Sequence, residues 1–216
     1  MIRLLSKKKA ILFDMDGVLF DSGTAHAASF QEAFLEAGIP PIPYREIAGT
    51  RTEEAVLKAL VIAGRSSDTD IIARVSSRKR ELARANLPVD ASIPDGCLEC
   101  IRRLADQFQL VLTSSASRST VDLFFQMSES RRYFSAVIAA EDIRRSKPDP
   151  EIFFKGLEMT TATAAEVVVV EDSANGIRAA KAAGLDVIAI VGTETRAALD
   201  KLSPTVIIAS LGELLV

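Results

Sequence analysis

Six short and almost uninterrupted runs of apolar residues recur along the chain. They are rich in valine, isoleucine and leucine, and longer polar stretches separate them. Apolar runs without alternation are typical of strands that are buried on both faces of a parallel sheet. We therefore predict strands at residues 10–13, 110–112, 136–140, 167–170, 187–191 and 206–209.

Helical periodicity fills most of the intervals between these runs. Apolar residues recur there at three- and four-residue spacing, and several of the segments end in glycine. Strands that alternate with helices are typical of an open α/β sheet with helices on both faces. The sequence thus predicts a Rossmann-like parallel core with helices at residues 95–107, 118–127, 150–158 and 175–184.

Residues 22–91 break this alternation, because they contain helical patterns but no convincing strand. Phe30 and Phe34 lie one turn apart in a helix that we expect to stop at Gly38. The sequence Thr-Arg-Thr-Glu at residues 50–53 resembles a capping box. Two further helices are predicted at residues 55–63 and about 68–86, joined by a loop at 66–70.

The helical segment divides the chain into an α/β core and an inserted all-helical cap. The length, 216 residues, fits one core and a smaller lobe. The expected core comprises residues 1–21 and 93–216, the cap comprises 22–92, and the linkers lie near 21–24 and 90–95.

Charge and composition limit the classes of molecule that the protein is expected to bind. The net charge of −3 gives no electrostatic footprint for nucleic acid or an anionic membrane, and aromatic residues, at 6% without Trp, offer little for base stacking. Acidic residues interrupt the apolar run after Lys7, Lys8 and Lys9 too early for a signal peptide, and no run is long enough to cross a membrane. We expect a cytoplasmic monomer that acts on a small molecule.

Scarce histidine and cysteine restrict the chemistry further. His26 is the only histidine, so a zinc site of several histidines is excluded and carboxylates must do most of the work. Cys97 and Cys100 form a lone Cys-x-x-Cys pair at the start of an expected helix. Without a second pair, we interpret them as buried apolar side chains rather than as a metal or redox site.

The first predicted strand runs directly into Asp14 and Asp16. Ligands of open parallel sheets bind beyond the carboxyl ends of the strands, which is where these two acids lie. A surface turn is the alternative interpretation, although the apolar strand before the acids favours a functional site. Gly17 supports a sharp chain reversal next to whatever the carboxylates bind.

Hydroxyl groups follow the second strand, at Thr113, Ser114 and Ser115. They could bind an anion, or they could only cap the next helix. Further along, Asp149 and Pro150 are typical of a helix start, which would hold Lys147 just outside the helix. A fixed ammonium there could neutralise a phosphate or a carboxylate.

A second acidic pair, Glu171 and Asp172, ends the fourth strand. Two acidic pairs without a histidine cluster suit a hard cation with oxygen ligands, such as Mg²⁺, that also binds phosphate oxygens. The sequence therefore predicts a Mg²⁺ site and a phosphorylated ligand at one edge of the sheet.

Three segments carry a family resemblance that covers essentially the whole chain. They read DMDGVLFDS from Asp14, KPDPEIF from Lys147 and VVVVEDSANG from Val167. In this order, with the hydroxyls of the second strand, they resemble the haloacid dehalogenase-like superfamily. The similarity is to its branch of small phosphatases and β-phosphoglucomutases with a helical cap.

The resemblance implies a role for each matching residue. Asp14 would be the nucleophile that becomes an aspartyl phosphate, and Asp16 the general acid/base, which requires a raised pKa. Lys147 would offset negative charge, and Ser114 would hold a phosphate oxygen. Because three hydroxyl residues lie in a row, the register is uncertain by one and Ser115 is a second candidate; Ser114 keeps the family's spacing to a basic residue, here Arg118.

The resemblance also implies the ligands of the metal. Asp14, Asp172 and the backbone carbonyl of Asp16 would bind Mg²⁺ directly. Glu171 would act on the same ion through water.

Residues of the cap help to distinguish a phosphatase from a mutase. His26, Arg51 and Lys79 resemble the hinge histidine and the phosphate-binding cap residues of β-phosphoglucomutases, and many sugar phosphatases carry a comparable histidine and arginine. Each could instead be an ordinary packing or surface residue, with Arg78, Lys79 and Arg80 forming a solvated face.

We expect a Mg²⁺-dependent phosphatase of a small phosphorylated metabolite, ahead of a β-phosphoglucomutase-type phosphotransferase. Asp16 argues against a dehalogenase. The helical insertion and the segment from Lys147 argue against a phosphate-accepting signalling module.

Overall fold

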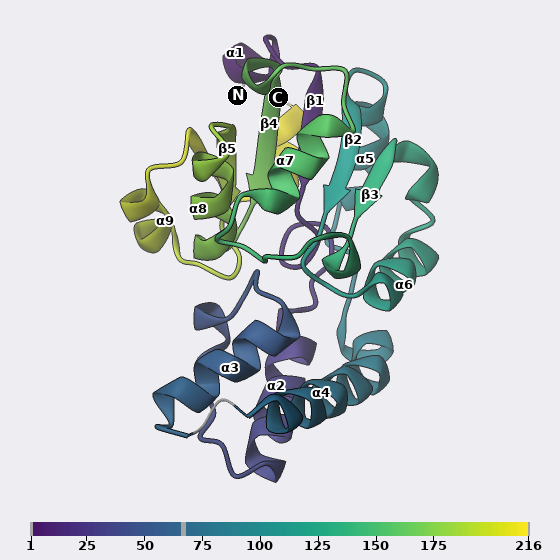
Figure 1. The fold of residues 1–216 in the computed structure, drawn as a ribbon. Coiled ribbons are helices and arrows are strands. Elements are labelled where there is room, and N and C mark those ends of the chain that lie inside the picture. Colours follow the sequence, from purple (N-terminus) through teal and green to yellow (C-terminus); the bar gives the residue numbers. More distant parts are fainter. Residues whose placement is uncertain (1, 66–67, 216) are drawn as a thin grey trace.

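One six-stranded parallel sheet forms the centre of the fold. The computed structural model describes residues 2–65 and 68–215, and its strands lie in the order β3-β2-β1-β4-β5-β6 (Figure 1). All six predicted strands are present. Their bounds are β1 (Ala10–Phe13), β2 (Gln109–Thr113), β3 (Ala136–Ile138), β4 (Val167–Glu171), β5 (Asp186–Ile190) and β6 (Val206–Ile208).

Strand β1 lies between β2 and β4, and its register brings the three strand ends to one level. Phe13 pairs with Leu112 on one side and with Val170 on the other. Because all three strands point the same way, the residues that follow them meet at the same edge of the sheet.

Alternation along β1 assigns the two faces of the sheet. Ile11 and Phe13 belong to the core under α5 and α6, whereas Ala10 and Leu12 belong to the core under α7, α8 and α9 (Figure 1). The predicted Rossmann-like architecture is confirmed. The helices outside the insertion are α1 (Ile2–Leu5), α5 (Cys97–Ala105), α6 (Arg118–Ser128), α7 (Glu151–Glu158), α8 (Ala174–Ala182) and α9 (Arg196–Leu202).

Short 3₁₀ helices occupy several connections. One of them makes strand β3 shorter than the expected strand at 136–140. The Asp142 carboxylate accepts from the Ala139 amide at 2.8 Å, and the strand ends after Ile138. The 3₁₀ helices are η1 (Tyr44–Glu46), η2 (Arg131–Tyr133), η3 (Ala140–Asp142), η4 (Ala164–Glu166) and η5 (Leu211–Leu215).

The inserted segment is helical and has its own core. It consists of α2 (Gly23–Glu36), α3 (Thr52–Ile62) and α4 (Thr69–Asp90) with η1, and it lies beyond the carboxyl ends of the strands (Figure 1). Its buried side chains include Phe30, Phe34, Ile47, Val56 and Leu60. The predicted all-helical insertion is confirmed.

The local structure of the insertion differs from the sequence predictions at the ends of two helices. The capping box is wrong, because the Thr50 hydroxyl donates to Ile47 O at 2.6 Å and α3 begins at Thr52 with no side-chain cap. Helix α4 continues beyond the expected end at residue 86 and includes Pro88. Part of the expected loop at 66–70, residues 66–67, lies outside the described residues.

The two connections to the insertion lie side by side. The Asp21 amide donates to Ser92 O at 2.8 Å, and the Ser92 amide donates to Asp21 O at 3.2 Å. We propose that the domain boundaries lie at this pair, with residues 1–21 and 93–216 as the core and 22–92 as the cap.

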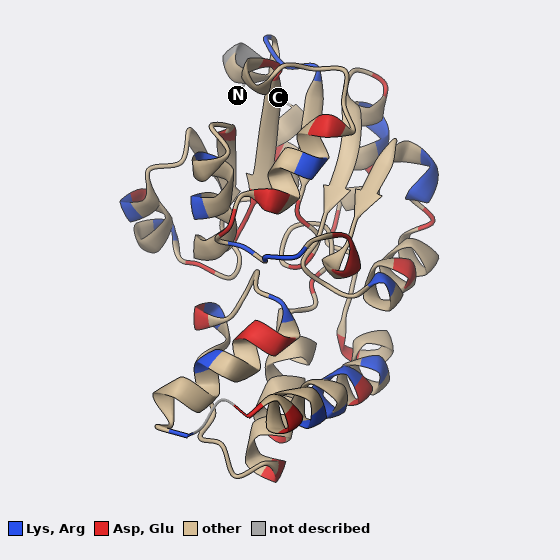
Figure 2. Cartoon of the chain, in the orientation of Figure 1, with Lys and Arg blue, Asp and Glu red and all other residues tan. Residues whose placement is uncertain are grey.

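Two further predictions concern thiols and charge. Cys97 and Cys100 are free and buried, and burial raises the pKa of each thiol to about 12, which makes them unreactive packing residues as expected. Basic and acidic residues are interspersed over the elements in Figure 2. Within residues 2–65 and 68–215, no helix is both long and apolar enough to cross a membrane.

Candidate active site

Functional side chains from three strand ends converge with Lys147, which comes from the connection before α7. The Asp14 amide continues the sheet by donating to Val170 O at 3.0 Å, which places Asp14 next to the end of β4. Glu171 and Asp172 end that strand, and Thr113 ends β2 on the other side.

The Lys147 ammonium lies at the centre of this group and is fully buried. Its Nζ donates to Asp14 Oδ1 at 2.6 Å, to Glu171 Oε1 at 2.8 Å and to the Thr113 carbonyl at 3.3 Å. Burial by itself would lower the pKa of Lys147, but the charges of Asp14 and Glu171 outweigh it and raise that pKa above its usual value. The side chain is therefore a permanent positive charge with all three of its donors in use.

Glu171 is held from both sides. Its Oε2 accepts from the amides of Asp172 and Ser173, each at 2.8 Å, and from the Ser173 hydroxyl at 3.0 Å. This inward position depends on Gly176, because a Cβ atom there would lie 1.6 Å from Glu171 Oε1. The glycine of the VVVVEDSANG segment is thus a requirement of packing around the carboxylate.

Asp172 depends on a glycine in the same way. Its Oδ2 accepts from the Thr193 amide at 3.0 Å. Gly17 has a φ of +79°, and a Cβ atom there would lie 2.0 Å from that same oxygen. The sharp reversal expected at Gly17 is present, and it lets the backbone pass directly over Asp172.

Asp14, Glu171 and Asp172 form a buried acidic cluster. One oxygen from each lies within 4.8 Å of the others. Burial, reinforced by the neighbouring carboxylates and opposed by Lys147, raises the pKa of Asp14 well above its usual range. Burial and the charge of Glu171 raise the pKa of Asp172 to about 7. Lys147 can balance only one of these three carboxylates, so the cluster lacks positive charge.

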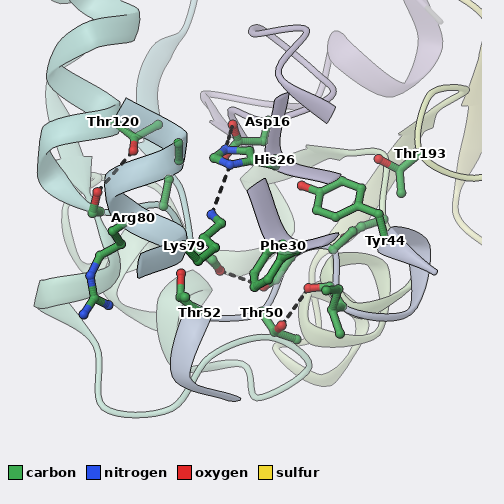
Figure 3. A pocket seen from close by; sticks show the side chains of 18 of the residues that line it. Asp16, His26, Phe30, Tyr44, Thr50, Thr52, Lys79, Arg80, Thr120 and Thr193 are labelled. Atoms are coloured by element: carbon green, nitrogen blue, oxygen red, sulfur yellow. Dashed lines mark hydrogen bonds and ion pairs between the residues drawn. The ribbon is translucent and has the colours of Figure 1, made fainter. Parts of the chain in front are cut away.

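The Asp16 carboxylate contacts side chains of the cap segment. Its Oδ1 accepts from the Ser22 hydroxyl at 2.5 Å and lies 3.4 Å from His26 Nε2 (Figure 3). Burial opposes ionisation, but the hydrogen bonds from His26 and Ser22 and the charges of His26 and Lys79 outweigh it and lower the pKa of Asp16. The raised pKa that the acid role requires is therefore not present in this arrangement.

His26 joins Asp16 to the cap helix α4. Its Nδ1 lies 3.1 Å from Lys79 Nζ. An ammonium can only donate, so with Lys79 charged the Nδ1 atom accepts and the ring proton lies on Nε2, facing Asp16. Burial, followed by the charge of Lys79, lowers the pKa of His26, and burial lowers the pKa of Lys79 to about 8. Both side chains are buried at the site, which rules out a surface position for either.

A cavity of about 70 Å³ separates the acidic cluster from the cap. The core contributes Asp14, Asp16 and Asp172 to its walls, and the cap contributes His26 and Lys79. The Tyr44 hydroxyl points into it (Figure 3). A space of this size admits a small group and a few waters. It is lined further by Thr50, Thr52, Arg80, Arg84, Ser115, Ser117, Ser119, Thr120 and Thr193.

Residues 11–190 match the family described as haloacid dehalogenase-like hydrolase. That match covers well over half of the chain. The chain belongs to this hydrolase family. The strand-end acids and the buried lysine all lie within the matched residues.

Relatives with assigned activities span most of this hydrolase. It is 28% identical over 183 residues to the phosphorylated carbohydrates phosphatase of Thermotoga maritima, with 82% of each chain covered. It is 25% identical over 178 residues to the fructose-1-phosphate phosphatase of Escherichia coli, covering 82% of this chain and 94% of the relative. The crystal structure of CbbY from Rhodobacter sphaeroides in complex with phosphate superposes with a TM-score of 0.81, at 26% identity and 96% coverage of both chains.

Three residues predicted to contact phosphate, Ser114, Ser115 and Arg51, have different surroundings in the structure. Ser114 is fully buried beside the site, and its hydroxyl accepts from the Ala116 amide at 3.0 Å. Ser115 lines the cavity but donates to Gly49 O at 2.7 Å. Arg51 does not line the cavity, and its guanidinium lies 3.4 Å from Arg144 O instead.

Four residues that line the cavity of this hydrolase were not singled out from the sequence: Tyr44, Arg80, Arg84 and Thr193. Arg80 was grouped with a solvated face, yet Arg80 and Arg84 lie one helical turn apart and line the cavity next to Lys79. That spacing was a usable signal. Tyr44 and Thr193 lie in connections whose position relative to the strand ends has no sequence signature.

The acidic cluster fits a divalent cation. It offers only hard oxygen ligands, it is buried, and it carries more negative charge than Lys147 can balance. Both oxygens of Glu171 already accept hydrogen bonds, so that residue suits contact through water, whereas Asp14 and Asp172 suit direct coordination. The predicted Mg²⁺ ligands are therefore compatible with the geometry.

Proposed function

We propose that this hydrolase is a Mg²⁺-dependent phosphatase of a small, sugar-like phosphomonoester and that it acts through an aspartyl phosphate on Asp14. One observation carries the proposal. A buried carboxylate, Asp14, lies 2.6 Å from a buried ammonium, Lys147, at the edge of a cavity that an acidic cluster completes. Such a site supplies a nucleophile together with fixed positive charge.

Phosphoryl transfer to Asp14 is the first proposed step. An Asp14 oxygen forms a bond to phosphorus as the bond from phosphorus to the substrate oxygen breaks. The substrate oxygen leaves with a proton that Asp16 donates. Lys147 stays protonated and offsets the charge that the phosphoryl group brings, and Ser114 lies at the neighbouring strand end as a proposed phosphate contact.

Hydrolysis restores the enzyme in the second step. Asp16 takes a proton from water, the water oxygen bonds to phosphorus, and the bond to Asp14 breaks to release inorganic phosphate. Mg²⁺ held by Asp14, Asp172 and the Asp16 carbonyl, with Glu171 acting through water, would offset phosphoryl charge in both steps.

Proton donation by Asp16 requires a rearrangement of its contacts. While the Ser22 hydroxyl donates to Asp16 and His26 faces it, the pKa of Asp16 is lowered and the carboxylate is ionised. Asp16 must exchange at least one of these partners for the substrate oxygen to become the acid.

A sugar-like substrate is supported by the relatives and by the kinds of side chain that line the cavity, which at about 70 Å³ must widen to admit it. The relatives from Thermotoga maritima and Escherichia coli bear the names of carbohydrate phosphate phosphatases. Several hydroxyl side chains line the cavity, together with arginines and Tyr44. Polar groups of these kinds can bind the hydroxyls of a small sugar.

The decisive experiment is phosphate release from a panel of phosphomonoesters, with and without Mg²⁺. We expect metal-dependent release from a few related sugar phosphates and none from the Asp14→Asn variant, whose circular dichroism spectrum should match the wild type. Release at near the wild-type rate by that variant would refute the proposal.

A β-phosphoglucomutase-type phosphotransferase is the second candidate. The observation in its favour is the buried contact between His26 and Lys79 next to Asp16, which gives the cap a direct connection to the proposed acid/base. The His26→Ala variant separates the two functions. It should change hydrolysis little in a phosphatase, whereas a mutase should lose most of its conversion of β-glucose 1-phosphate.

A further inference from the structure

The segment at residues 48–54, called here the cap loop, includes the first turn of α3 and contacts the core next to residues of the candidate site. The Ala48 carbonyl accepts from Asn175 Nδ2 at 2.9 Å, and the Gly49 carbonyl accepts from Ser115 Oγ at 2.7 Å. Both donors lie close in sequence to proposed site residues, since Ser115 follows Ser114 directly and Asn175, in the first turn of α8, lies three residues after Asp172. The cap loop is thus held by the same strand ends that build the site.

A third contact of the cap loop is made by a carboxylate. Glu54, in the first turn of α3, accepts from the Ser146 amide at 3.2 Å and from the Ser146 hydroxyl. Ser146 is buried, with 4% of its surface exposed, and it directly precedes Lys147. A buried amide and a buried hydroxyl therefore obtain their acceptor from the insertion rather than from the core.

The adjoining amides make the contrast clear. The amides of Arg144 and Arg145 both donate to Glu151 at 3.0 Å, and that contact lies within the core. Of these three successive amides, only that of Ser146 donates to the cap. The amides of Arg144 and Arg145 thus take their acceptor from the core, and the amide of Ser146 takes its acceptor from the cap.

We propose that Glu54 is a positioning residue for Lys147. By accepting both donors of Ser146 when the cap lies against the core, it holds the backbone from which Lys147 reaches Asp14. This inference rests on the proposed function, which gives Lys147 its role. It adds that the position of the cap affects where the positive charge of Lys147 lies relative to Asp14.

The physical reason is the cost of unpaired buried donors. If the cap moves away, the Ser146 amide loses its acceptor, and its hydroxyl retains only a 3.4 Å contact with the Lys147 carbonyl. A connection freed in this way can shift, and small displacements of a catalytic ammonium lower the rate strongly. The position of the cap and the placement of Lys147 are therefore coupled through Glu54, and another cap contact with this connection, from Arg51 to Arg144 O, is long at 3.4 Å.

Amide hydrogen exchange tests the contact without any substrate. In the Glu54→Ala and Glu54→Gln variants, the Ser146 amide should exchange about tenfold or more faster than in the wild type, with the larger effect in Glu54→Ala. The amides of Arg144 and Arg145, held by Glu151, serve as internal controls and should not change. Equal exchange at Ser146 in all three proteins would overturn the inference.

Steady-state kinetics test the consequence for the reaction. We expect kcat to fall by about tenfold to a hundredfold in Glu54→Ala, by less in Glu54→Gln because the amide oxygen still accepts, and KM to change little. Glu36→Gln is the matched control, because Glu36 pairs with Arg78 on the outside of the cap. Unchanged kcat in Glu54→Ala, or an equal loss in Glu36→Gln, would overturn the positioning role.

The two experiments separate this inference from the proposed function. A wild-type protein that releases no phosphate from any ester would refute the phosphatase and the role of Lys147, while the Ser146 exchange would still decide whether Glu54 fixes the connection. An active wild type with an unaffected Glu54→Ala variant would leave the phosphatase standing and refute the inference alone.

Discussion

The two halves of the candidate site are built in different ways. The half around Lys147 comes entirely from the core, and its ammonium donates to a carboxylate on each side, Asp14 and Glu171. The half around Asp16 is completed by His26 and Lys79 from two helices of the insertion. The groups that directly contact the Lys147 ammonium thus belong to the core, whereas His26, which faces the Asp16 carboxylate together with Ser22, belongs to the cap.

Both halves contain groups with shifted pKa values. On the core side, the pKa of Lys147 is raised by its carboxylate partners, so its charge is constant. On the cap side, burial lowers the pKa of Lys79 to about 8 and also lowers that of His26. Each half thus has a group that can change protonation near neutral pH: Lys79 from the cap, and Asp172 from the core, whose pKa is raised to about 7.

The largest effect should come from removing the charge of the core half. In Lys147→Met, Asp14 and Glu171 remain buried without their ammonium, and we expect kcat to fall by roughly a thousandfold and stability by about 3–5 kcal/mol. Steady-state kinetics and urea unfolding measure the two losses. A kcat within tenfold of the wild type would show that the core half does not depend on this lysine.

A pH-dependent effect should mark the cap half. The folded-state pKa of Lys79, about 8, lies below its ordinary value of 10.5. Between pH 8 and pH 10.5 the unfolded chain binds more protons at this residue, so its contribution makes stability rise with pH, and below pH 8 the penalty is fully present.

Lys79→Met should remove this penalty, which amounts to at most about 3 kcal/mol. Urea unfolding of both proteins across that pH range tests the expectation. The variant should gain most relative to the wild type below pH 8, and the difference should shrink at higher pH. A difference that stays constant with pH would mean that Lys79 is not the titrating group.

The smallest of the three effects concerns the packing of the core half. Gly176→Ala would place a Cβ atom 1.6 Å from Glu171 Oε1 and should displace that carboxylate, at a cost of about 1–3 kcal/mol. Gly212→Ala is a matched control, because its Cβ would meet nothing closer than 3.7 Å. Thermal unfolding should separate the two variants, and equal melting temperatures would contradict the packing role of Gly176.

The core half could be predicted from the sequence because its residues follow strands. Asp14 and Asp172 directly follow or end apolar runs, and parallel strands bring such residues to one edge. Lys147 was recognisable from its motif, and the structure adds that it lies between Asp14 and Glu171.

The cap half was less predictable because it depends on how two separate units dock. Arg51 was expected to contact phosphate, yet it lies near Arg144 O, while Arg80 and Tyr44 line the cavity. Ser115 was a phosphate candidate, and its hydroxyl donates to the cap loop instead. Such contacts are set by the orientation of the insertion, which periodicity does not encode.

The paired backbones of Asp21 and Ser92 have a consequence for how such a protein can diversify. The chain leaves the core and returns to it within one pair of hydrogen bonds. A different segment could be spliced between these two residues without altering the course of the strand before it or of the helix after it. The sheet with its charged edge can thus persist through evolution as a constant scaffold, while the inserted segment is exchanged to suit a new substrate.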